Sequence, residues 1–305
     1  MSKYKTCFFS PNQSSETIHG VKFIGMMNSS CDIPELYRGF GDISTTMFAL
    51  PTICLGLFGH RLPERVTMED IRLHKTTNIT DDAHMVSLTT NKQVAKDWGN
   101  KNYITLDPVL FRQYVIDVHK TYTYHHYNLP GRMEREAEHV ALAVLFCSVK
   151  SITIGDTDIK NPFYVAIDEH NEEAIQAFEN LYLDYLTLLR TLREQPGQAE
   201  EASGLLVEFV ETYLSFYDKF AGPDNPFDKT ADELLIHYPE FVTRFLQQAG
   251  HVDCQTVTFK ELARTSNKNL IENHAYGRTL TQATPFNPSQ IVTCYDDPWS
   301  YSTYE

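Results

Sequence analysis

The sequence of 305 residues contains no long uninterrupted apolar run. The longest near-apolar stretch, residues 48–59, includes Pro51 and falls short of the roughly 20 residues that a membrane-spanning helix takes. No basic segment followed by an apolar one opens the chain, so no cleaved export signal is expected. We therefore expect a protein that neither crosses a membrane nor anchors itself in one.

Patterns typical of disulfide frameworks and metal sites are also missing. The six cysteines are scattered, without a C-x-x-C pair: Cys7, Cys31, Cys54, Cys147, Cys254 and Cys294. Such spacing favours reduced thiols in a reducing cytosol. Four histidines show no H-E-x-x-H or equivalent spacing: His119, His125, His126 and His139. No metal is expected.

Positive charge is scarce in the second half of the chain. The sequence has 26 basic and 40 acidic residues and a net charge of −14; residues 1–160 hold 17 of each, and residues 161–305 hold 9 basic and 23 acidic. A surface this acidic repels phosphate backbones, which argues against a nucleic-acid partner. It suits either a basic protein partner or a solubilising helical surface.

Short strands are expected in the first half and long helices in the second. The predicted strands are Gly20 to Met27, His84 to Thr90, Tyr103 to Leu106, Tyr114 to His119 and Ser151 to Ile154. Asn91 should start a helix that Gly99 ends. After Asp168, apolar residues repeat every three or four positions, at Ile175, Phe178, Tyr182, Tyr185, Leu189 and Leu192. A second long helix is predicted from about Glu200 to Phe220, which makes the fold class α+β.

Acidic residues alternate at Glu134, Glu136 and Glu138, directly before an apolar run. Side chains two apart share a strand face, so the pattern predicts a strand that enters the core with its acids on one side. Like charges held this close suggest a cation or a chemical task. The competing interpretation is a solvated edge strand.

Two further motifs carry polar groups suited to ligand binding. Arg38 lies between aromatic residues, where its stem can pack while its planar fork faces a cleft, and the next residue, Gly39, would let a ligand approach the backbone. Ser87 and Thr89 share a face of the His84 to Thr90 strand. Alone, each motif is a weak signal: an ordinary surface arginine near a turn would be the better interpretation of the first, and Ser/Thr alternation is common in plain strands.

In this order and spacing, the three motifs resemble the arginine–serine–glutamate class of mono-ADP-ribosyltransferases, the cholera-toxin-like group. The resemblance covers roughly residues 20–160 and rests on Tyr37-Arg-Gly39, on Val86 to Thr90 with Ala95 and Trp98, and on Glu136-Ala-Glu138. It implies a mixed β-sheet core typical of ADP-ribosyltransferases in residues 1–165. An acidic helical domain (166–277) and an extended C-terminal tail (278–305) would follow.

The resemblance also implies NAD+ as substrate and a role for each motif. Glu138 would face the positive charge that develops on the ribose as nicotinamide leaves, and Glu136 would orient the acceptor arginine and draw off its proton. Arg38 would pair with an NAD+ phosphate, and Ser87 would hydrogen-bond Glu138. Gly39 and Thr89 complete the implied NAD+-binding set.

The sequence departs from the family pattern at two places. Leu88 and Thr89 replace the usual second and third residues of the hydroxyl motif, which weakens a direct role for Thr89 more than one for Ser87. Glu134 leaves two registers open, 134/136 and 136/138. We prefer the second because Val140 then begins the buried strand just past the second acid.

The function expected from this resemblance is transfer of ADP-ribose from NAD+ to an arginine of a target protein. The alternatives are an NAD+ glycohydrolase and a non-catalytic binding module with a degenerate transferase-like fold. Without an export signal, the protein is expected to be a Legionella-type effector, made in the bacterial cytosol and delivered into the host cytoplasm. No residue identifies the target protein. A host metabolic enzyme is the class of target that we expect. The loop Tyr124 to Arg132 takes the place of the family's substrate-recognition loop.

Overall fold

The structure is a computed structural model. It describes residues 6–8, 15–18, 21–24, 28–30, 35–40, 54–59, 65–76, 85–108, 115–119, 136–194, 199–221, 239–249 and 293–295. Glu134, the loop Tyr124 to Arg132 and most of the predicted tail lie outside these residues.

An antiparallel sheet runs through the described part of the chain and contains all three motif strands. Its order is β14 (Thr157–Lys160), β13 (Val149–Ile154), β9 (Tyr103–Leu106), β5 (Leu36–Gly39), β8 (Val86–Thr89), β11 (Glu138–Ala141), β10 (Ile116–Asp117), β4 (Asn28–Ser30), β1 (Thr6–Phe8) and β15 (Thr293–Tyr295). Each pairing in this sheet is antiparallel. The predicted α+β class is therefore confirmed as a mixed fold with a mostly antiparallel sheet.

Two smaller sheets complete the described strands. β2 (Ser15–Ile18), β3 (Val21–Ile24) and β7 (Arg65–Val66) form one, in which β3 and β7 run parallel. β6 (Leu57–Phe58) pairs with β12 (Ala143–Val144) in the other. A 3₁₀ turn, η1 (Phe146–Ser148), leads from β12 into β13.

The helices α3 (Lys92–Trp98) and α6 (Pro162–Glu169) begin at residues that carry capping signals. α3 starts after Asn91, whose side chain accepts from two backbone N–H groups, and ends at Gly99, as predicted. α6 has Asn161 as its N-cap and Pro162 in its first turn. The others are α2 (Met68–Thr76), α7 (Glu172–Glu194), α8 (Ala199–Phe220) and α10 (Pro239–Gln248).

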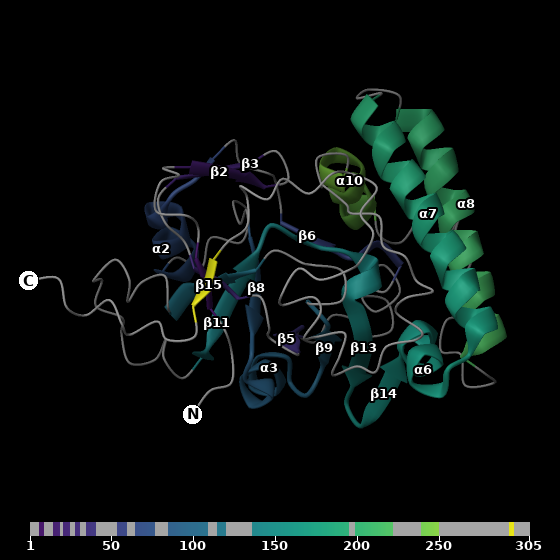
Figure 1. Ribbon diagram of the computed structural model, residues 1–305, viewed down its shortest axis with the longest axis horizontal. Coiled ribbons are helices and arrows are strands. Elements are labelled where there is room, and N and C mark those ends of the chain that lie inside the picture. Colours follow the sequence, from purple (N-terminus) through teal and green to yellow (C-terminus); the bar gives the residue numbers. More distant parts are fainter. Residues whose placement is uncertain are drawn as a thin grey trace, which may run out of the picture.

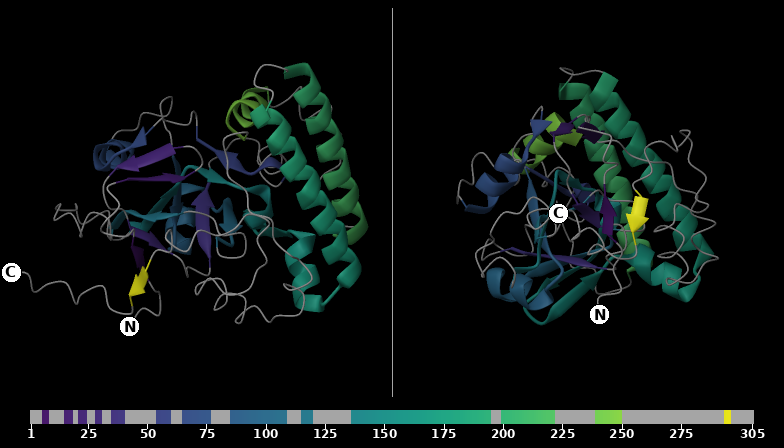
Figure 2. Two further views of the ribbon diagram at one scale, coloured as in Figure 1. Left: turned by 45° about the horizontal axis from the view of Figure 1, so that its top comes forward. Right: turned by 60° about the vertical axis from the view of Figure 1, so that its left-hand side comes forward.

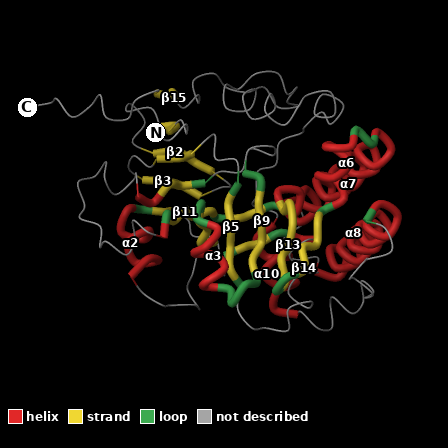
Figure 3. Tube along the Cα trace, turned by 90° about the horizontal axis from the view of Figure 1, so that it is seen from below, coloured by secondary structure: helices red, strands yellow, loops and turns green. Residues whose placement is uncertain are grey.

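The helices α7 and α8 run side by side at one end of the molecule, and α2 lies at the other end (Figures 1 and 2). Seen from below, β5, β9, β13 and β14 lie in a row that leads towards α6, α7 and α8 (Figure 3). None of the helices among the described residues has the length and apolar character that crossing a bilayer requires.

The long helices share one hydrophobic core with the sheet. The predicted stripe on α7 is buried at Ile175, Phe178, Tyr182, Tyr185 and Leu189, with Leu192 partly buried. The ring of Phe146, in η1, lies 4.6 Å from Tyr185 and 5.5 Å from Phe209, centroid to centroid. The hydroxyl of Tyr185 donates to the carbonyl of Leu55, and that of Tyr217 to the carbonyl of Lys160. The fold thus anchors its helices through the same interior that supports the strands.

Candidate active site

The three motif strands are immediate neighbours in the sheet, with β8 between β5 and β11. Tyr37 pairs with Thr89, and Thr89 pairs with Glu138 across the next ladder. Directly paired residues project to the same face, so these three side chains form a row, with Ser87 two positions along from Thr89. Segments separated by about 50 residues therefore meet at one place, as the resemblance implied.

The Glu136-Ala-Glu138 motif is a turn into β11 and not the alternating strand that we predicted. β11 begins at Glu138, and Ala137 has a left-handed backbone with φ of 44°. The hydroxyl of Thr89 donates to the carbonyl of Glu136 over 2.6 Å, and the N–H of Thr90 donates to the carbonyl of Ala137 over 3.3 Å. These bonds from β8 hold the turn in place of a continued ladder, so the period-of-two prediction is wrong at Glu136 and Ala137.

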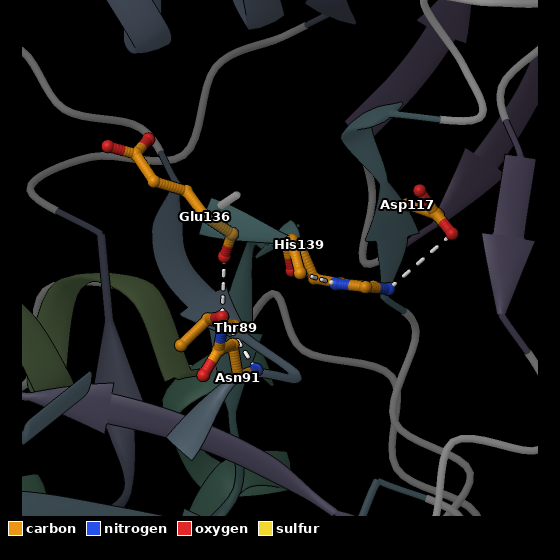
Figure 4. A network of polar contacts seen from close by, with 6 residues as sticks. Thr89, Asn91, Asp117, Glu136 and His139 are labelled. Atoms are coloured by element: carbon orange, nitrogen blue, oxygen red, sulfur yellow. Dashed lines mark hydrogen bonds and ion pairs between the residues drawn. The ribbon is translucent and has the colours of Figure 1, made fainter. Parts of the chain in front are cut away.

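The two glutamates differ in their surroundings. The carboxylate of Glu136 lies away from Thr89 while its backbone carbonyl faces the Thr89 hydroxyl (Figure 4). Glu136 is partly exposed, whereas Glu138 is buried with 8% of its surface accessible. A shielded carboxylate is suited to act electrostatically on a bound substrate, and an outward one to meet an incoming group.

Thr89 hydrogen-bonds both this turn and the backbone just before α3. Its hydroxyl donates to Glu136 and also accepts from the backbone N–H of Asn91 over 2.9 Å. Thr89 therefore holds the turn, and the NAD+ contact that the resemblance implied for it stays a prediction.

Arg38 contacts the serine strand directly. Because side chains alternate along β5, the Arg38 side chain leaves the strand on the face opposite to Tyr37. Its Nη1 donates to the backbone carbonyl of Ser87 over 2.8 Å. Burial lowers the pKa of the Arg38 guanidinium, which stays protonated because the ordinary pKa of this group is so high. One bond uses only part of the five-donor fork, so an anion can still bind the rest.

No sequence pattern pointed to His74 of α2, which also contacts the serine strand. Its Nε2 forms a 2.8 Å hydrogen bond with the hydroxyl of Ser87. The contact implied between Ser87 and Glu138 is not among the hydrogen bonds of the described residues, so that role remains a proposal. His74 lies in a polar segment with no recognisable spacing, and only tertiary packing brings it to β8.

Gly39 lets β5 and α3 pack closely against each other. A Cβ at this position would lie 2.3 Å from the carbonyl oxygen of Ala95 and 2.8 Å from the N of Gly99. A side chain at this position would therefore clash with the backbone of α3 and its C-cap, and the approach of a ligand to the Gly39 backbone stays a prediction.

We predict that Gly39→Ala lowers the free energy of unfolding by about 1–3 kcal/mol, because the backbone of α3 must move to admit the methyl group. Urea denaturation followed by circular dichroism measures the change. The matched control is Gly204→Ala on α8, where a Cβ meets nothing within 4 Å and helix propensity predicts a small gain. Equal stability of the Gly39→Ala and wild-type proteins would contradict this account of the packing.

Within the described residues, no group of three or more His, Cys, Asp or Glu side chains is placed to hold a metal ion. The arrangement that the structure does show is an arginine, a hydroxyl and one carboxylate on adjacent strands, with a second carboxylate, that of Glu136, in the turn before β11.

Comparison with known proteins gives two agreeing results. The model of the Lart1 ADP-ribosyltransferase family matches residues 26–280. The NAD(+)--arginine ADP-ribosyltransferase Lart1 of Legionella pneumophila subsp. pneumophila strain Philadelphia 1 is 42% identical over 304 residues, covering 100% of this chain and 99% of that protein. No solved structure matches the chain. The resemblance read from the sequence is confirmed, and the chain belongs to the Lart1 ADP-ribosyltransferase family.

Proposed function

We propose that this protein transfers ADP-ribose from NAD+ to an arginine side chain of a protein. The observation that carries the proposal is the full-length similarity to an NAD(+)--arginine ADP-ribosyltransferase. The meeting of Arg38, Ser87 and Glu138 on three adjacent strands supports it. NAD+ is the substrate, and no metal is assigned a role.

Glu138 and Glu136 divide the chemistry. Cleavage breaks the bond between the ribose and nicotinamide, whose nitrogen keeps the electron pair, and leaves positive charge on the ribose. The buried carboxylate of Glu138 stabilises this charge more in the transition state than in the ground state. A nitrogen of the acceptor arginine then forms the new bond and loses a proton. Arginine is protonated at working pH, so the outward carboxylate of Glu136 orients it and takes up that proton.

Incubation of the protein with labelled NAD+ and eukaryotic lysate tests this function. We expect labelled ADP-ribose on a protein. A treatment that cleaves only arginine-linked ADP-ribose should release this label. Free ADP-ribose alone would indicate a glycohydrolase, and no reaction would indicate a binding module with a transferase-like fold.

Arg38 is proposed to bind an NAD+ phosphate through the free part of its fork. We expect Arg38→Lys to raise the Kd for NAD+ about tenfold, because a point charge cannot reproduce the planar fork while the Ser87 carbonyl holds one side. Calorimetry on the Glu138→Gln background avoids turnover during the titration. An unchanged Kd would leave Arg38 the single task of holding β8.

Residues 166–277 are proposed to form an acidic helical domain that helps to select the target. Exposed carboxylates on α7 and α8 include Asp184, Glu208 and Glu211. Partial burial and the nearby Glu208 carboxylate raise the pKa of Asp184. Protein arginines often lie on positively charged surfaces, which the negative charge of these helices attracts. This attraction raises the rate at which enzyme and target meet more than it changes the chemical step.

Reversing these charges with Asp184→Lys, Glu208→Lys and Glu211→Lys together should slow labelling of the target about tenfold at low salt. The salt dependence of the rate should shrink as well, because screening then has less attraction to remove. Hydrolysis of NAD+ by water should not change. The control is Asp156→Lys at the turn between β13 and β14. If both activities fall together, or neither changes, the helices do not select the target.

The site of action is proposed to be the host cytoplasm, after translocation from the bacterium without a cleaved signal peptide. The Legionella origin of the relative supports this proposal. A translocation reporter fused to the protein tests it, and a signal confined to the bacterium would refute it.

A further inference from the structure

A buried polar pair lies next to the Glu136-Ala-Glu138 turn. His139 on β11 and Asp117 on β10 are cross-strand partners, 5% and 7% exposed, with Nε2 of His139 3.6 Å from Oδ2 of Asp117 (Figure 4). Their strand neighbours Ile116 and Val140 are buried and apolar. Placing two ionisable side chains here costs free energy unless they are paired and hydrogen-bonded, so their contacts are informative.

The other ring nitrogen of His139 contacts the turn itself. Nδ1 lies 2.9 Å from the carbonyl oxygen of Ala137, and a carbonyl only accepts, so Nδ1 carries a hydrogen and donates it. This bond fixes the ring with Nε2 towards Asp117. The ring thus contacts the turn through one nitrogen and faces the Asp117 carboxylate with the other.

The turn needs to be held. Ala137 is in the left-handed region, with φ of 44°, which costs a residue with a Cβ roughly 1–2 kcal/mol. Such a conformation persists where surrounding groups hold it. The carbonyl of Ala137 accepts from both Thr90 N–H and His139 Nδ1–H. Thr90 directly follows β8, and His139 is the second residue of β11. The directions of the Glu136 and Glu138 side chains follow from this one backbone conformation.

We propose that His139 is a positioning residue for the two glutamates and that Asp117 orients its ring. The proposal rests on the proposed transferase function and adds to it the groups that fix the carboxylates. His139 touches neither NAD+ nor the acceptor; it holds Ala137 so that Glu138 and Glu136 project correctly. A catalytic group displaced by about 1 Å can lose about 10²-fold in rate.

Two isosteric substitutions separate the two contacts of the ring. His139→Asn places an amide N–H where Nδ1 lies and keeps a donor for Ala137, but it loses Asp117. His139→Gln places its amide where Nε2 lies and keeps Asp117, but it loses the donor for Ala137. We expect His139→Gln to lower kcat for NAD+ hydrolysis by about 10–100-fold with KM for NAD+ within about twofold. His139→Asn should stay within about fivefold of wild type in kcat. The reverse order would overturn the proposal.

A control for general destabilisation is Ile116→Ala, which opens a cavity on β10 beside Asp117 and removes no polar contact. It should lower the melting temperature and leave kcat within about twofold of wild type. If it lowers kcat as much as His139→Gln, lost stability explains the effect and the inference fails.

Hydrogen exchange at the Thr90 amide gives a readout that does not need activity. This amide donates to Ala137, so its protection relative to global stability should fall about tenfold in His139→Gln and not in His139→Asn. Equal protection in both variants overturns the inference whatever the kinetics show. An inactive wild-type protein would instead count against the transferase function, and the exchange result would still decide the role of His139.

Discussion

Glu138→Gln is expected to lower the rate of NAD+ cleavage about 10²–10³-fold, both with an arginine acceptor and with water. The amide keeps the shape of the side chain but removes the charge that faces the ribose as nicotinamide leaves, and the loss of one such stabiliser typically has this magnitude. Burial strengthens the effect because little water screens the carboxylate, which is 8% exposed. Release of nicotinamide in single-turnover experiments measures it, and calorimetry should show retained NAD+ binding.

The matched comparison is Glu134→Gln, which tests the other register of the acidic motif. Glu134 lies outside the described residues, but β11 starts at Glu138 and the bonds from Thr89 and Thr90 hold residues 136 and 137. We expect Glu134→Gln to keep most of the activity. An inactive Glu134→Gln protein beside an active Glu138→Gln protein would move the catalytic pair to 134/136.

Glu136→Gln is expected to separate transfer from hydrolysis. Its carboxylate projects away from the held backbone (Figure 4), and its proposed task is to orient the acceptor and take its proton. General-base losses typically amount to about 10²–10⁴-fold, so transfer to agmatine, a small arginine analogue, should fall about 10²-fold. Hydrolysis by water should stay within about threefold, because water does not need this carboxylate to orient a guanidinium.

Both rates are measured from the same reaction, as ADP-ribosylagmatine and free ADP-ribose. Gln93→Glu, an exposed change on α3, controls for altered surface charge near the site. If Glu136→Gln lowers hydrolysis and transfer equally, Glu136 takes part in cleaving NAD+, and the division of labour between the two acids is wrong.

Local signals were enough to predict elements whose ends are set by neighbouring residues. Asn91 and Gly99 bound α3 because a cap acts within a few positions of the helix end. The stripe through Phe178 and Tyr185 indicated a buried helix face because the helical period brings those residues together. The order of the three motifs indicated the family, which the comparisons confirm.

The details of the site depend on contacts that no local pattern encodes. Alternating acids indicated a strand through Glu136, but Ala137 adopts φ of 44° because Thr90 and His139 bond its carbonyl. Alanine carries no preference for that region, so the sequence had no signal for it. The bond between His74 and Ser87 likewise joins α2 to β8 through packing. The packing of Gly39 against the backbone of α3 is also set by tertiary structure.

The aromatic core that the sheet shares with α7 and α8 limits which fragments of this protein can fold. Phe146 precedes β13 and lies among rings from α7 and α8, and the hydroxyl of Tyr217 bonds the last residue of β14. A fragment ended at residue 165 would leave these rings facing water and would be prone to aggregate. Chimeras that exchange α7 and α8 between relatives must therefore also exchange the η1 residues that pack against these helices. We expect such a chimera to fold only when both sides of this interface come from the same protein.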